Sequence, residues 1–116
     1  MSKTLCKIRD LQRALDAYAA AFEAAHGLSL KEGMLLCCIA ESERTASEIA
    51  LATELSSSNC SKIIASAEKK ELLRRSLGAS DKRNMFFGLT EKGKRVLENI
   101  NANPLEVPVV LRKIIE

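Results

Sequence analysis

The residues best suited to chemistry in this chain are polar and basic side chains gathered in two short segments. Asp81-Lys82-Arg83 lies within a stretch of glycine, serine and asparagine that predicts a turn at the tip of a hairpin. Upstream, Ser56-Ser57-Ser58-Asn59 opens a segment whose exposed side should be small, polar and basic. Hydroxyls and amides donate hydrogen bonds and cations pair with phosphate, so both segments suit binding of a polyanion.

The distribution of charge favours the same chemistry. The net charge of the chain is only +3, but residues 56–95 contain ten lysines and arginines against four acidic residues. A basic block on a near-neutral scaffold is typical of polyanion binders. Charge alone leaves an ordinary solvated helical surface open as the alternative.

The sequence gives little support to a catalytic site or a metal site. The four cysteines show no metal-ligand spacing, and His26 is the single histidine. The chain also contains no glycine-rich phosphate loop and no convergent pair of carboxylates. We therefore expect a protein that is not an enzyme and that has no cofactor and no metal.

The cysteines and the N-terminal sequence indicate the cell compartment in which the protein is expected. Cys37, Cys38 and Cys60 lie in helical, largely apolar surroundings and are expected to be buried free thiols of a reducing cytosol. Cys6 lies beside Lys3 and Lys7, which favour its thiolate, so it is the candidate redox sensor. No apolar run is long enough for a membrane span or a signal core, which predicts a cytoplasmic protein with no membrane partner.

Hydrophobic spacing and capping signals predict a mostly helical chain. Residues 5–26 place apolar side chains every three or four positions, as one amphipathic helix ending at Gly27 does. Ser29–Glu32 and Thr45–Glu48 match capping boxes that start the next two helices. The predicted elements are helices over 5–26, 30–41, 45–53, 59–70, 90–101 and 108–115, and strands over 72–77 and 85–89.

This order predicts a mainly α fold with a small β-hairpin wing, that is, a winged helix-turn-helix. The helix over 30–41 should be its buried centre. In the helix over 59–70, Cys60, Ile63, Ile64 and Ala67 should face inward. The outward positions should be Ser58, Asn59, Lys62, Ser66 and Lys69.

The ordered motifs resemble those of the multiple-antibiotic-resistance regulator (MarR) family of bacterial winged-helix transcription factors. The matching segments are Ser58–Ile64, Ala67–Arg75, Asp81–Arg83 and Leu89–Gly93. Two positions depart from the family pattern. Glu71 stands where a glycine is usual, and Ala67 replaces a bulkier core residue.

The resemblance implies a sequence-specific DNA-binding regulator, with repression the favoured role. It would bind a pseudo-palindromic operator on double-stranded DNA as a homodimer, with a small-molecule effector as a further candidate partner. The implied organisation is a single domain over 1–116, with a DNA-binding core over 30–89 and dimerisation helices over 1–27 and 90–116. The termini would pair across a two-fold axis through apolar stripes on the first and last helices.

The predicted DNA contacts divide between the grooves and the backbone. The serine-rich helix would enter the major groove, where small hydroxyls allow close approach. Arg83 would enter the minor groove, oriented by Asp81, while Lys82 holds a flanking phosphate. The complete set of predicted DNA-binding residues is Thr45, Ser47, Ser57, Ser58, Asn59, Ser61, Lys62, Ser66, Lys69, Arg75, Asp81, Lys82 and Arg83.

One alternative stays open at this point. Winged helices also serve as protein–protein adaptors without a DNA role. The wing tip distinguishes the two hypotheses, because an adaptor has no need of Asp81-Lys82-Arg83 beside a basic helix.

Overall fold

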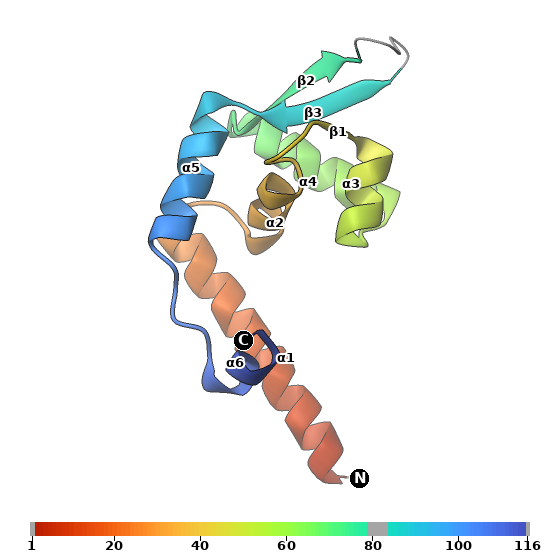
Figure 1. Cartoon of the computed structure of the whole chain (residues 1–116). Coiled ribbons are helices and arrows are strands. Elements are labelled where there is room, and N and C mark those ends of the chain that lie inside the picture. The colour runs from red at the N-terminus through yellow and green to blue at the C-terminus, as the bar shows by residue number, and fades with distance from the viewer. Residues whose placement is uncertain (1, 79–83, 116) are drawn as a thin grey trace. The chain divides into compact units, whose positions relative to one another are not determined.

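A computed structural model describes residues 2–78 and 84–115 (Figure 1). Among these residues no helix combines the length and the apolar character that crossing a membrane requires. The elements are, in chain order, α1 (Ser2–His26), α2 (Leu30–Cys38), β1 (Arg44–Thr45), α3 (Ala46–Thr53), α4 (Ser57–Lys69), β2 (Leu73–Leu77), β3 (Met85–Leu89), α5 (Glu91–Ala102) and α6 (Val109–Ile115).

The chain divides into two compact units. The first comprises the residues up to Leu30 and those from Asn103 onward, and the second comprises Lys31–Ala102. Helix α5 therefore belongs to the same unit as α2, α3, α4 and the sheet. The boundary at Ala102 differs from the sequence-based boundary at Leu89, and the contacts of Gly93 described below explain the difference.

The first unit pairs the long helix α1 with the short helix α6. Gly27 ends α1 with a left-handed backbone (φ 75°), and its amide donates to the carbonyl of Glu23 at 2.9 Å, as predicted for a C-terminal cap. Leu111 of α6 is buried. Other apolar side chains of these two helices remain exposed, namely Leu5, Ile8, Leu15, Val109, Val110, Ile114 and Ile115.

The second unit is a winged helix-turn-helix. Its three antiparallel strands have the order β1-β3-β2, and the β2–β3 hairpin forms the wing (Figure 1). Leu73 pairs with Leu89 at the base of the hairpin, and Leu77 pairs with Met85 toward its tip. The buried side chains of this unit include Leu35, Leu36, Ile39, Ile49, Ile64, Leu72 and Phe87.

Two polar caps hold the helix-turn-helix in shape. The Thr45 hydroxyl accepts the Glu48 amide while the Glu48 carboxylate accepts the Thr45 amide, which confirms the predicted capping box. Ser56 caps α4 by accepting the Asn59 amide at 3.2 Å. The Cys60 thiol lies 3.7 Å from the Ala46 carbonyl oxygen and ties α4 back to α3.

The end of α2 differs from the prediction. The helix stops at Cys38 rather than near Glu41, because Arg44 Nε donates to the Cys38 carbonyl at 2.9 Å and turns the chain into β1. Strand β1 has only two residues and was not predicted. Leu35 and Leu36 place α2 in the core as predicted, whereas Met34 and Cys37 on its other side are exposed.

Glu71 follows α4 in a left-handed conformation (φ 62°), the backbone region that favours glycine. A residue with a Cβ is strained there. Glu71→Gly should therefore raise the free energy of unfolding by about 0.5–1 kcal/mol, after allowance for the greater freedom of glycine in the unfolded chain. Urea denaturation measures this change in the free energy of unfolding.

The control for this change is Lys69→Gly, two residues earlier at the end of α4. There the backbone is helical, so the same replacement should lower the free energy of unfolding by about 1 kcal/mol. A loss of stability in Glu71→Gly would contradict the strain at this turn.

Candidate nucleic-acid interface

The first half of α4 presents a polar face to solvent. Its predicted outward residues are exposed along the first turns of the helix, and Lys62 adds a cation without an ion-pair partner among the described residues. Ser47 of α3, with Ser57 and Ser61 of α4, lines a shallow hollow of about 200 Å³ between the two helices. The structure thus brings together Ser47, Ser57, Ser58, Asn59, Ser61 and Lys62 on the exposed side of the helix-turn-helix.

Ser66 does not point outward as predicted. It is half-buried, and its hydroxyl donates to Glu32 Oε2 of α2 at 2.9 Å. The Lys70 ammonium group donates to Glu32 Oε1 at 2.7 Å. Periodicity within α4 missed this because the partner carboxylate comes from a helix more than thirty residues earlier.

Arg75 is exposed and forms an ion pair within the protein, and its predicted phosphate contact stays a prediction. Its Nε and Nη2 atoms donate to the two oxygens of Glu68, both at 2.6 Å, and its guanidinium carbon lies 5.3 Å from the centre of the Phe87 ring. The bidentate pair lowers the pKa of Glu68 and raises the pKa of Arg75. Arg75 therefore links α4 to the wing strands.

The Glu68–Arg75 pair predicts a dependence of stability on acid. Because its pKa is lower in the folded chain, Glu68 contributes stability above its ordinary pKa of 4.5, and loses it as pH falls through the lowered value. Glu68→Gln should therefore be less stable than wild type at neutral pH. This difference in stability should disappear once the pH falls below the lowered pKa of Glu68. Thermal unfolding from neutral to acidic pH measures the difference, with the exposed Glu98→Gln as control. A difference independent of pH would contradict the assignment.

Thr45 lies at the start of α3 with its hydroxyl engaged in the capping box. The Thr45 amide donates to the Glu48 carboxylate, and this bond is the main reason that the pKa of Glu48 is lowered. Lys69 is exposed at the end of α4. A DNA contact by Thr45 or Lys69 stays a prediction.

The predicted contacts of the wing tip, Asp81, Lys82 and Arg83, lie outside the described residues. Below the tip, Glu43 crosses the sheet to β2, accepting the Ser76 hydroxyl at 2.5 Å and lying 3.6 Å from an Arg74 nitrogen. Together with Glu32–Lys70, this pair brings a carboxylate from outside residues 56–95 to a cation of the basic block. The free positive charge is therefore smaller than the sequence count suggests.

The Leu89–Gly93 motif locks the root of the wing. The Thr90 hydroxyl caps α5 by accepting the Gly93 amide at 2.9 Å, and donates to the Glu71 carbonyl at 2.7 Å. The Thr90 amide donates to the Leu72 carbonyl at 3.2 Å. One threonine thus joins three elements, the turn after α4, the end of β3 and the start of α5.

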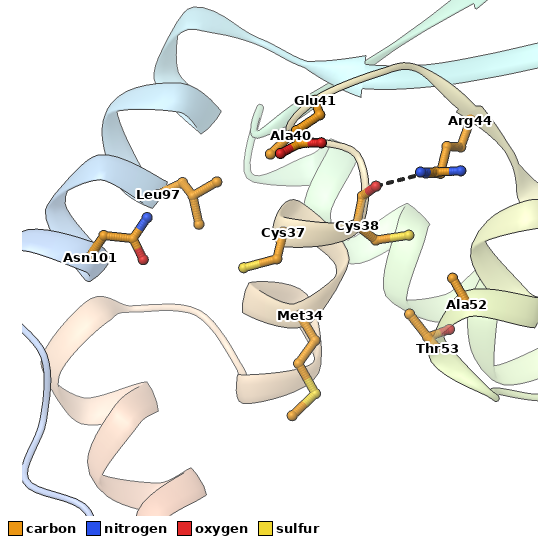
Figure 2. Close-up of a pocket in the computed structure, with 10 residues that line it drawn as sticks. All are labelled: Met34, Cys37, Cys38, Ala40, Glu41, Arg44, Ala52, Thr53, Leu97 and Asn101. Carbon is orange, nitrogen blue, oxygen red and sulfur yellow. Dashed lines mark hydrogen bonds between the residues drawn. The ribbon is translucent and has the colours of Figure 1, made fainter. Parts of the chain in front are cut away.

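A pocket of about 740 Å³ lies in the second unit (Figure 2). Leu97 and Asn101 of α5 line one side, and Ala52 and Thr53 of α3 line the other, with α2 between them. The volume falls within the range of small-molecule sites. It could hold the predicted effector, which stays a prediction.

The thiols are less uniformly buried than expected. Cys60 is buried, and burial, helped by the nearby Cys38, raises the pKa of its thiol. Cys38 is half-buried, whereas Cys6 and Cys37 are exposed, so the expectation of buried thiols fails for Cys37. No metal-binding cluster of histidine, cysteine and carboxylate side chains occurs within residues 2–78 and 84–115.

Comparison with known proteins identifies relatives by sequence and by fold. Residues 26–84 match a sequence model described as MarR family. No functionally curated protein matches the chain by sequence.

Solved structures match more of the chain. AbsC of Streptomyces coelicolor, a MarR family transcriptional regulator, is 25% identical with a TM-score of 0.73, covering 88% of this chain and 73% of AbsC. A mutant form of Staphylococcus aureus MepR is 20% identical with a TM-score of 0.71, covering 82% and 72%. A complex of S. aureus MepR with DNA is 19% identical with a TM-score of 0.66, covering 94% and 85%. The MepR matches show similarity of fold.

Proposed function

Because this chain belongs to the MarR family of transcriptional regulators, we propose that it is a sequence-specific DNA-binding regulator, with repression the favoured role. Members of the family are transcription factors and not enzymes, in agreement with the sequence. The proposed partner is double-stranded DNA with a pseudo-palindromic operator, bound by a homodimer. The similar MepR fold has been solved with DNA.

The observation that carries the proposal is the polar face at the start of α4. Ser58, Asn59 and Lys62 are exposed on the helix that follows the tight Ser56 turn, as on a recognition helix. Small hydroxyls allow the helix to approach base edges closely, while Asn59 and Lys62 can donate hydrogen bonds to them. The β2–β3 wing would reach the minor groove through Arg83.

The exposed apolar side chains of α1 and α6 support the homodimer. A monomer rarely leaves so many large apolar side chains in water. We assign the first unit to dimerisation and the second to DNA binding. Two recognition helices would then lie about one turn of DNA apart, roughly 10 base pairs.

The proposal predicts a steep dependence of DNA affinity on salt. Lys62→Ala should weaken binding several-fold and lower the slope of log affinity against log salt concentration by about one ion. Arg83→Ala should weaken binding as well. Fluorescence anisotropy with genomic fragments selected by the wild-type protein measures both.

Lys31→Ala is the matched control, because it removes the same charge from an exposed position outside the proposed contacts. It should leave affinity within about twofold of wild type. Failure of the wild-type protein to retain any genomic fragment at low salt would refute DNA binding and favour the adaptor hypothesis.

A further inference from the structure

Among the residues that the structure describes, Glu32 is the charged residue that is buried, with 4% of its side chain exposed. It lies in the first turn of α2, next to the boundary between the two units. Its two carboxylate oxygens accept from Ser66 and Lys70, which lie one turn apart on α4. A buried charge from one helix thus holds two consecutive turns of another.

These bonds constrain α4 in a way that its apolar contacts do not. Cys60, Ile64 and Ala67 bury small or medium side chains, and apolar burial has no preferred direction. Hydrogen bonds weaken steeply when their angle or length departs from the optimum. The Glu32 carboxylate therefore restricts both the rotation of α4 about its axis and its position along that axis.

The exposed polar face lies along the same side of α4 as Ser66. Lys62 and Ser58 precede Ser66 by four and eight residues, so Ser58 lies about 12 Å from Ser66 along the axis. A tilt of about 10° at Ser66 would move Ser58 by about 2 Å, enough to break a hydrogen bond to a base edge. The orientation set at the end of α4 is therefore transmitted to its start.

We propose that Glu32 is a positioning residue for DNA recognition, which orients α4 through Ser66 and Lys70 without touching DNA. The proposal rests on the DNA-binding function proposed above. Its consequence is that Glu32 controls the ratio of specific to non-specific affinity. A substitution of Glu32 should leave the number of phosphate contacts unchanged, because none of those contacts involves Glu32.

The test is Glu32→Gln, which keeps the shape of the side chain but removes its charge. Anisotropy titrations would use a duplex selected by the wild-type protein from a random library, and a scrambled duplex of equal length. Affinity for the selected duplex should fall about tenfold, while affinity for the scrambled duplex changes less than about twofold. The salt slope should stay that of wild type.

A second variant separates orientation from stability. Glu32→Leu with Lys70→Met replaces the ion pair by apolar side chains of similar size, which can restore the stability of the fold. Its melting temperature should approach that of wild type while its specificity ratio stays low. Lys31→Met is the matched control for the lost positive charge, because it neutralises an exposed lysine outside the proposed DNA contacts.

The orientation of α4 can be measured without DNA. Residual dipolar couplings of the α4 amides, compared with those of α2 in the free protein, should change in Glu32→Gln. Unchanged couplings with an unchanged specificity ratio would overturn the proposal, as would an equal loss of affinity for both duplexes. If wild type binds neither duplex, the DNA-binding function fails, and the couplings still decide whether Glu32 orients α4.

Discussion

Gly93→Ala is expected to lower the free energy of unfolding by about 3 kcal/mol and to abolish DNA binding. A Cβ at this position would lie 2.1 Å from the carbonyl oxygen of Leu72 and 3.1 Å from its carbon. That carbonyl also accepts the Thr90 amide, so it is fixed by the bond at the root of the wing. The backbones must separate to admit the methyl group, which should displace α5 from β2 and loosen the Thr90 cap.

The comparison is with Gly88→Ala, one strand position before Leu89. A Cβ there would meet Glu43 Cγ at 3.0 Å and Arg74 Nη2 at 3.5 Å, both in flexible side chains that can move. Its cost should stay below about 1 kcal/mol. Urea denaturation followed by circular dichroism measures both variants. Equal stability of Gly93→Ala and wild type would show that α5 does not pack this closely.

Much of the fold could be predicted because its signals are local. Capping boxes depend on residues three apart, so Thr45–Glu48 and the Thr90 cap are legible in the sequence. The wing strand Met85–Leu89 follows from its apolar run between turn residues. Strand β1 was missed because two residues carry no period, and Arg44 pairs with Phe87 only through the folded sheet.

The exposure of the candidate residues was predicted well where the helix period alone decides it, and less well where a distant partner decides it. Ser58, Asn59 and Lys62 face solvent because their neighbours in the helix face the core. Ser66 and Arg75 look equally free by spacing, yet Glu32 and Glu68 engage them across the fold. Pairing of that kind depends on tertiary packing, which one sequence does not display.

The same limit applies to charge. A net of +6 over residues 56–95 suggested a strongly basic surface. Carboxylates from outside that block pair with two of its cations, Glu32 with Lys70 and Glu43 with Arg74. Charge that is paired in the fold contributes less to attraction for phosphate. We therefore expect Lys62 and the predicted wing-tip cations to contribute more to DNA affinity than the count of basic residues implies.

Leu15→Glu and Ile114→Glu are expected to convert the proposed dimer into monomers and to weaken binding to a palindromic duplex about 100-fold or more. Leu15 on α1 and Ile114 on α6 are 51% and 71% exposed, so a charge at either place leaves the fold of the chain intact. A carboxylate buried between two copies would be desolvated without a partner, and the dimer would dissociate. Sedimentation velocity measures the mass, and anisotropy measures the affinity.

Ala17→Glu is the control, because it adds the same charge to an exposed position of α1 on a different face from Leu15. It should leave both dimer and affinity unchanged. The loss of affinity should vanish on a duplex containing one half-site, since a monomer and one arm of a dimer make the same contacts there. Equal losses on one and two half-sites would mean that the substitutions damage the DNA-binding unit itself. A wild-type chain that sediments as a monomer would require another explanation for the exposed apolar residues of α1 and α6, and would remove the reason to expect a palindromic operator.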